Sequence, residues 1–168
     1  MAGDLSLNEW VVLALLAEGP SHGFAMAKEL APDADLGRIL TVARPLVYRA
    51  LARVVDAGLA ESVHIEPGDA GPNRTVHRLT RSGRARLRGW LAAPVDHVRD
   101  LRIEFLVKMR LLERSSKDTA SLVEAQRVAL DDAFERLVHL ELEADIVDLW
   151  RHHNAVAARS FLDHLASP

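Results

Sequence analysis

Arginine is the residue type with the clearest chemical potential in this sequence. Six arginines lie between Arg74 and Arg88, and no aspartate or glutamate lies among them. A guanidinium group binds phosphate well because its planar fork donates parallel hydrogen bonds. The whole chain nevertheless has a formal net charge of -3, and acidic residues outnumber basic ones after residue 95. This uneven distribution indicates two regions with different roles, one of them beside an anion; a solvated arginine-rich helix is the alternative interpretation.

Histidines and glutamates in the last part of the chain form a second group with chemical potential. Glu135, His139 and Glu143 are spaced by four residues, so they would share one face of a helix. The later histidines are His152, His153 and His164. The sequence contains no His-Glu-x-x-His or comparable signature, and a few scattered ligands seldom form a metal site. We therefore predict no metal site and no cofactor.

Signatures of catalysis are missing from the sequence. It contains no cysteine, which removes disulfides, thiol catalysis and cysteine-based zinc sites. It contains no glycine-rich phosphate loop and no Gly-x-Ser-x-Gly motif, so we do not expect an enzyme. There is also no apolar run of membrane-spanning length and no secretory pattern at the start. We expect a cytoplasmic protein with no membrane segment.

Helical periodicity predicts three helices at the start of the chain, which must position the arginines. Ser6 and Glu9 have the spacing of a capping box at the start of the first helix, which Gly19-Pro20 ends. Ser21 is expected to cap a short second helix. The third helix should run from about Arg44 to Ala57, and Gly58 supplies the residue that ends it.

After Gly58 the period of the apolar residues changes to that of a strand. Leu59–Glu66 and Arg74–Leu79 are predicted to pair as a hairpin around a loop rich in proline and glycine, and a fourth helix starts near Arg81. Two helices joined by a turn present the later one to the major groove of DNA, and a basic hairpin can reach a phosphate or the minor groove. The order therefore favours a winged helix-turn-helix, although small α+β domains also produce it.

The second half of the chain is predicted to be helical. Val123, Leu130, Leu137 and Ala144 recur every seven residues, as in helices that pack on other helices. A last helix from about Asp148 to Leu165 should place Trp150, Val156, Phe161 and Leu162 on its apolar positions. We expect a mainly α fold with a small β-hairpin, in which 1–94 form a DNA-binding domain and 95–168 a helical dimerisation region; an intramolecular core is the alternative for the heptads.

Several segments, in order and at this spacing, resemble the PadR family of winged-helix transcriptional regulators. They are Leu5–Leu16, Ser21–Met26, Val47–Val54, Asp56–Leu59, and Leu79–Gly83 followed by Trp90-Leu91. The resemblance covers roughly the first ninety residues, and the helical tail resembles the subgroup with an extended C-terminal dimerisation region.

The resemblance implies a homodimer that binds an inverted repeat in double-stranded DNA, usually as a repressor, and that sometimes releases DNA when a small molecule binds. Two segments depart from the family. Pro45-Leu46 stands where the family often carries small or hydroxyl residues, and Thr75-Val76-His77 replaces an aromatic-rich strand. The first departure and the overall acidity leave open a protein-interaction module without specific DNA binding.

Candidate DNA contacts lie on the second helix, the third helix and the hairpin. Arg49 can reach a guanine edge or a phosphate, whereas Tyr48 and Arg44 are phosphate candidates. Tyr48 could instead be an anchor between helices, Ser21 only a cap, and Arg74 a solvated charge. The full set is Ser21, His22, Arg44, Tyr48, Arg49, Arg53, Asn73 and Arg74.

The tryptophans suggest a second kind of site. Trp10, Trp90 and Trp150 are few and bulky, and could line a pocket for a small aromatic effector. Ordinary core packing is the alternative interpretation.

Overall fold

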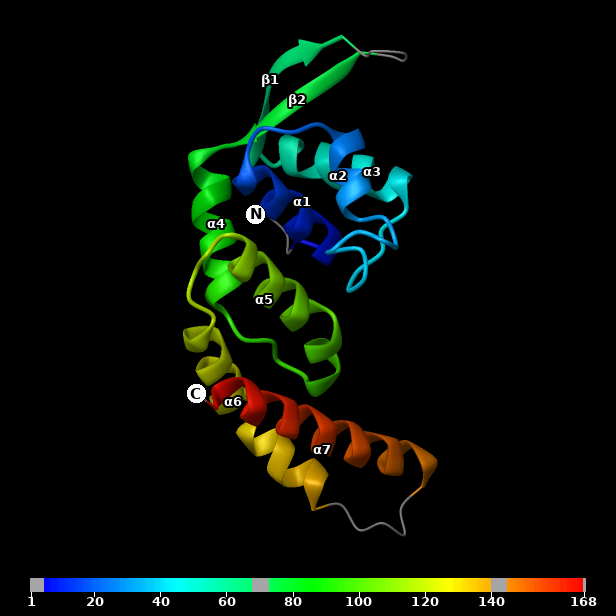
Figure 1. Ribbon diagram of the computed structural model, residues 1–168, viewed down its shortest axis with the longest axis vertical. Coiled ribbons are helices and arrows are strands. Elements are labelled where there is room, and N and C mark those ends of the chain that lie inside the picture. Colours follow the sequence, from blue (N-terminus) through cyan, green and yellow to red (C-terminus); the bar gives the residue numbers. More distant parts are fainter. Residues whose placement is uncertain (1–4, 68–72, 140–144, 168) are drawn as a thin grey trace. The chain divides into compact units, whose positions relative to one another are not determined.

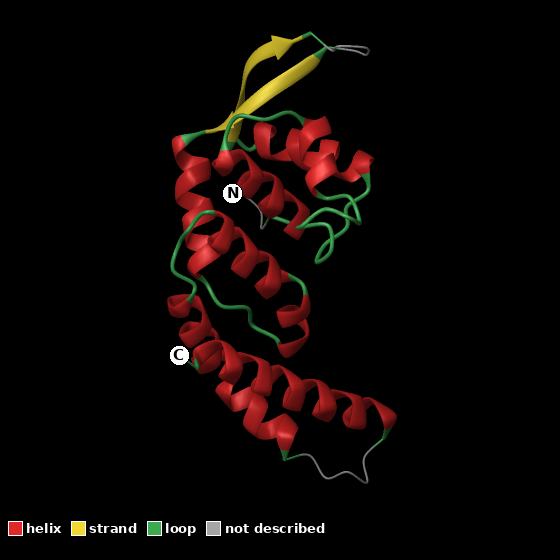
Figure 2. Cartoon of the chain, viewed as in Figure 1, coloured by secondary structure: helices red, strands yellow, loops and turns green. Residues whose placement is uncertain are grey.

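A computed structural model of the chain describes residues 5–67, 73–139 and 145–167. The chain forms two compact units, Met1–Leu91 and Ala92–Pro168. The first contains the hairpin and the second contains helices alone (Figures 1 and 2). The predicted fold class, mainly helical with one small hairpin, is confirmed.

The first unit has the predicted order of elements. These are α1 (Leu7–Glu18), α2 (Gly23–Glu29), α3 (Arg44–Asp56), β1 (Ala60–Glu66), β2 (Arg74–Leu79) and α4 (Arg81–Ala92). The capping box forms as predicted, because the backbone N–H of Ser6 donates to Glu9 Oε2 over 2.8 Å. Gly58 ends α3 with a φ of 68°, which favours glycine.

The core of the first unit centres on α1. Its residues Val11–Leu16 are all buried, and the helix packs against α3 and β2. On the facing side of α3 the buried residues are Val47, Ala50, Leu51 and Val54. One side of α3 therefore holds the helix in the core, which leaves its other side free for recognition.

The start of α2 corrects one prediction. His22, not Ser21, is the N-cap, because His22 Nδ1 accepts a hydrogen bond from the backbone N–H of Ala25 at 3.1 Å. The backbone of Ser21 pairs instead with that of His77 in β2, through hydrogen bonds of 2.9 Å and 2.8 Å. Ser21 thus fastens the hairpin to the beginning of α2.

The hairpin is antiparallel, with Glu66 opposite Arg74 and Ala60 opposite Leu79, and an irregularity between Ser62 and His64. Figure 2 shows the two strands extending from the helices of the first unit. Burial in the hairpin is uneven: β1 buries only Ala60 and exposes Val63 and Ile65 despite its alternating pattern, whereas β2 buries Val76 and Leu79. The hairpin is therefore a wing whose first strand is accessible beyond its base. The predicted loop between the strands lies mostly in 68–72, outside the described residues.

The second unit consists of a short 3-10 helix η1 (Val98–Arg102), α5 (Glu104–Arg114), α6 (Ala120–Val138) and α7 (Ile146–Ala166). Helices α6 and α7 lie side by side (Figure 1). The heptad residues Val123 and Leu130 are buried, whereas Leu137 is half-buried and Ala144 lies outside the described residues.

The apolar positions expected on α7 are mostly not in the core of the single chain. Leu162 is buried, but Trp150, Val156 and Phe161 are exposed, and the other buried residue of the helix is Ala155. Within the single chain the buried face of α7 is formed by Ala155 and Leu162, and it leaves these three apolar residues uncovered.

Two buried polar side chains fix the start of the second unit. Gln126 accepts from the N–H of Val95 at 2.7 Å and donates to its carbonyl at 2.9 Å. Lys108 Nζ donates to the carbonyl of Ala93 at 3.0 Å and pairs with Glu104 at 2.8 Å. Both side chains are almost completely buried, so these bonds satisfy groups that water cannot reach. We call this arrangement the polar clamp.

Within the described part of the chain, every helix is too short or too polar to cross a membrane.

Candidate nucleic-acid interface

The outer face of α3 carries three of the predicted contact residues. Arg44, Tyr48 and Arg49 are exposed, on the side of the helix away from its buried residues. Pro45 in the first turn suits the helix start, because an N–H at this position would have no partner within the helix. An amphipathic helix of 13 residues with a cationic outer face has the form needed to enter a major groove.

Tyr48 takes part in the contact between α2 and α3 and remains partly exposed. Its ring lies so close to Gly23 that a Cβ atom there would come within 2.8 Å of Tyr48 Cε1. The glycine thus allows α2 and α3 to approach each other, and the ring contributes to that contact. The side chain nevertheless stays 43% exposed, so the residue is an anchor at the edge of an accessible surface.

Three cationic side chains surround the ring of Phe24 on α2. Lys28 Nζ lies 4.8 Å from the ring centroid, and the Cζ atoms of Arg44 and Arg74 each lie 5.0 Å from it. The side chains come from α2, α3 and β2, so this Phe24 cluster is where the helices and the wing meet. Such cation–π contacts orient charged groups while leaving them near solvent.

Sequence reasoning found only part of this cluster. Arg44 and Arg74 were predicted contacts, whereas Phe24 and Lys28 were missed. The available signal was their spacing of four residues within a short helix beside the predicted turn. The structure brings all four together.

The other predicted contacts differ in how far their charges are already compensated. Within the described part of the chain, the side chain of Arg49 is exposed and makes no hydrogen bond or ion pair. Arg53 lies farther along α3, where its Nε is 3.5 Å from Glu9 Oε1. Its side chain is still 69% exposed, but part of its charge is balanced inside the fold.

On the wing, Asn73 is exposed and lies directly before Arg74, the first residue of β2. Arg78, farther along the same strand, donates to Glu61 over 2.8 Å, so it is paired across the hairpin. Among the described arginines of the wing, Arg78 is therefore paired, and Arg74, which contacts Phe24, is not.

The base of the wing carries a partly buried histidine, His77. Burial lowers the pKa of His77 from its ordinary value of 6.5, although a backbone hydrogen bond with Thr75 opposes the shift. The same residue holds the backbone pair with Ser21. Protonation would place a charge where β2 joins α2.

The tryptophans do not form a single cluster within one unit. Trp10 and Trp90 stack with their ring centroids 5.2 Å apart, and Arg86 lies over Trp10 at 5.8 Å. Trp150 belongs to the second unit, where it is 69% exposed. The stacked pair anchors α4 to α1 in the first unit.

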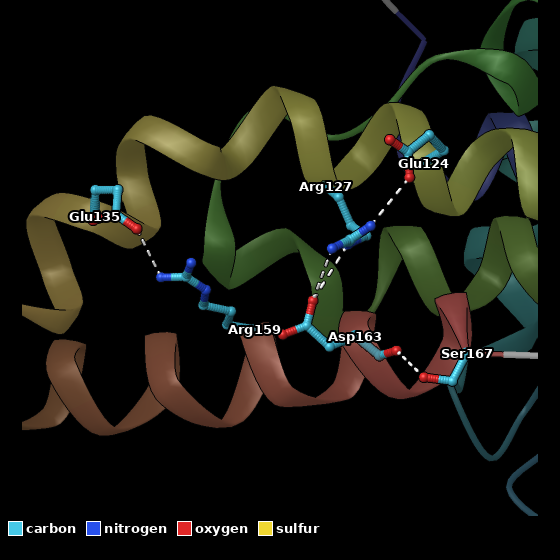
Figure 3. Close-up of polar contacts among 6 residues, drawn as sticks. All are labelled: Glu124, Arg127, Glu135, Arg159, Asp163 and Ser167. Carbon is cyan, nitrogen blue, oxygen red and sulfur yellow. Dashed lines mark hydrogen bonds and ion pairs between the residues drawn. The ribbon is translucent and has the colours of Figure 1, made fainter.

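A surface pocket of about 340 Å³ lies between α6 and α7, and tryptophan is not among its lining residues. Arg127 bridges Glu124 and Asp163 there, and Arg159 pairs with Glu135 (Figure 3). The Arg127–Asp163 and Arg159–Glu135 pairs join the two helices but contribute little stability, because they are exposed.

The predicted metal-ligand candidates are only partly described. Glu135 and His139 lie 3.4 Å apart, whereas Glu143 is outside the described residues. Among the residues that the structure covers, no group of three or more histidine, aspartate or glutamate side chains is arranged to hold a metal ion.

Solved structures of other proteins are similar to this chain in fold. The structure of Bacillus subtilis PadR in complex with operator DNA is similar in fold, with a TM-score of 0.52 and 17% identity over 98% of this chain and 100% of that chain. A transcriptional regulator from Clostridium thermocellum aligns with a TM-score of 0.44 and 20% identity, over 66% of this chain and 90% of its own. A comparison with curated proteins finds no match.

The family model named "Transcriptional regulator PadR-like family" matches residues 12–89, from within α1 to within α4. The match thus spans the helices and the wing described above and confirms the resemblance found in the sequence. The winged-helix region, residues 12–89, belongs to the PadR-like family of transcriptional regulators.

Proposed function

We propose that this regulator is a cytoplasmic homodimer that binds an inverted-repeat operator specifically and acts as a repressor. The observation that carries the proposal is the outer face of α3, where Arg44, Tyr48 and Arg49 are exposed together while the opposite face is buried. In this reading α3 enters the major groove, Arg49 reads a base edge, and the wing contacts the backbone or the minor groove.

The apolar surface of α7 supports the pairing of two chains. Its exposed large apolar residues are Ile146, Val147, Leu149, Trp150, Val156 and Phe161. So many on one helix are typical of a protein interface, and a second copy is the partner that the proposed inverted repeat requires. A two-fold dimer would present its two α3 helices about 34 Å apart, one turn of DNA.

Fluorescence anisotropy with the DNA upstream of the protein's own gene, against a scrambled duplex over a salt series, tests the proposal. We expect tight, salt-sensitive binding to the native fragment and a much lower affinity for the scrambled duplex. Arg49→Ala should weaken specific binding by about 1–3 kcal/mol and reduce the ratio of these two affinities. Arg136→Ala removes one exposed charge from α6 and should leave binding unchanged.

An unaltered preference for the operator in Arg49→Ala would contradict the assignment of Arg49 to base reading. Equal, weak binding of the wild type to both duplexes would instead support the second candidate, a protein-interaction module, which the net charge of -3 favours. Repression is checked separately by expression from the bound promoter, which should rise when the gene is deleted.

The proposal also includes a small aromatic effector that releases the regulator from DNA. The stacked Trp10 and Trp90 provide an intrinsic fluorescence reporter for it. A compound from a broad aromatic panel that quenches this fluorescence should also weaken operator binding, and quenching by none would count against the effector.

A further inference from the structure

The Phe24 cluster holds more positive charge than its own surroundings balance. Lys28, Arg44 and Arg74 make no side-chain hydrogen bond or ion pair within the described residues, although Glu66 lies opposite Arg74 in the hairpin register. All three point at one ring at 4.8 to 5.0 Å from its centroid. Any two of these charges thus lie within about 10 Å of each other, a distance at which salt screens repulsion only partly.

The three side chains are held in place by separate parts of the fold. Lys28 lies one helical turn from Phe24 on α2, and Arg44 occupies the first turn of α3. Arg74 is three residues from His77, whose backbone is bonded to that of Ser21, two residues before the start of α2. The convergence therefore results from the packing of three elements, and the charges are brought together before any ligand arrives.

We propose that Lys28, Arg44 and Arg74 bind one and the same phosphate group of the DNA backbone, and that Phe24 is the platform that positions them. A phosphodiester carries one negative charge and several acceptor oxygens, so it can accept from an ammonium and two guanidinium groups at once. The inference rests on the proposed DNA binding and deepens it, because it fastens the wing and the helix-turn-helix to a single point on the duplex.

The shared phosphate makes a numerical prediction. Each neutralised phosphate contributes about 0.9 to the slope of log K against log salt concentration. Two copies bind one operator in the proposed dimer, so the triple variant Lys28→Ala/Arg44→Ala/Arg74→Ala should lower the slope by about 1.8 if each copy's three cations share one phosphate, and by about 5.4 if each cation binds its own. A matched control, Arg102→Ala/Lys117→Ala/Arg136→Ala, removes the same charge from exposed positions of the second unit.

Phe24→Leu tests the platform separately, because it keeps an apolar side chain at this half-buried position and keeps all three cations. We expect operator affinity to fall about five- to tenfold, as in the loss of a contact worth about 1 kcal/mol. The helical circular dichroism of both variants shows whether they are folded.

The outcomes separate the two proposals. A slope loss of about 1.8 beyond the control, together with weaker binding by Phe24→Leu, supports the shared phosphate. A loss of about 5.4, or none beyond the control, overturns it while the wild type still binds its operator. A wild type that binds no DNA specifically overturns both this inference and the proposed function.

Discussion

The two units of this chain differ in where they place large apolar side chains. In the first unit, α1 buries six consecutive residues, Val11–Leu16, and the exposed large hydrophobic residues are Tyr48 on α3 and Val63 and Ile65 on the wing. In the second unit, α7 has 21 residues, of which the buried ones are Ala155 and Leu162. The first unit has a well-filled core of its own, whereas the second exposes on α7 the apolar surface that a second copy would cover in the proposed dimer.

The largest expected effect is on the core of the first unit. Leu13→Ala should lower the free energy of unfolding of the first unit by about 3–5 kcal/mol, because Leu13 is fully buried and its removal leaves a cavity. Urea denaturation monitored through Trp10 and Trp90 measures the loss, which should not depend on protein concentration. Leu149→Ala on α7 is the matched substitution at a partly exposed site. The loss of unfolding free energy that it causes should grow as the protein is diluted. A concentration-dependent loss in Leu13→Ala would break the contrast.

The polar clamp gives the next largest effect, and it lies in the second unit. Gln126→Leu should cost about 2–4 kcal/mol, because it leaves the buried N–H and carbonyl of Val95 without partners. Hydrogen exchange should show faster exchange of the Val95 amide. Asp132→Asn, at an exposed position of the same helix, is the control and should change neither quantity. An unchanged Val95 amide in Gln126→Leu would show that the clamp does not hold this segment.

The apolar face of α7 supplies a comparison of matched substitutions between the units. Trp150→Glu should raise the dimer dissociation constant at least about 100-fold, or about 2.7 kcal/mol, by placing a charge in the proposed interface. Ile65→Glu on the wing is the control, because Ile65 is 65% exposed and Trp150 is 69% exposed. Sedimentation equilibrium should find the Ile65→Glu protein dimeric. An equal rise of the dimer dissociation constant in both variants would mean that a charge at any exposed apolar position weakens the dimer, and would contradict an interface on α7.

The smallest expected effect concerns pH and the base of the wing. Because burial lowers the pKa of His77 in the folded state, the fold favours the neutral imidazole. The associated stability is fully present above the ordinary pKa of 6.5 and is lost as the pH falls below it. Urea denaturation of the wild type and His77→Gln between about pH 5 and 8 isolates this contribution as their difference. A difference that does not vary with pH would contradict it.

Local patterns predicted the elements well, for identifiable reasons. The capping box, the glycine after α3 and the change to period two each depend on neighbouring residues, and each is confirmed. Ser21 was misassigned because its backbone bonds to His77, a partner far along the chain. The apolar positions of α7 were recognised as apolar, but periodicity does not say whether the same chain or another one covers them.

The candidate site was predicted only in part for the same reason. Arg44, Tyr48 and Arg49 share a helix whose buried stripe is visible in the sequence, so their outward position followed from spacing. The Phe24 cluster joins residues from α2, α3 and β2, and no local pattern encodes that convergence. Sequence reasoning therefore found its arginines but not the ring that gathers them.

The polar clamp also sets a rule for recombining such regulators. Ala93 and Val95 are bonded to side chains of α5 and α6, so the segment that follows α4 belongs structurally to the tail. A chimera that joins this winged helix to a foreign tail has to be cut before Ala93. A cut placed after Val95 would combine the linker of one protein with the tail of another. The buried side chains that bind this linker, Gln126 and Lys108, would then lose their partners.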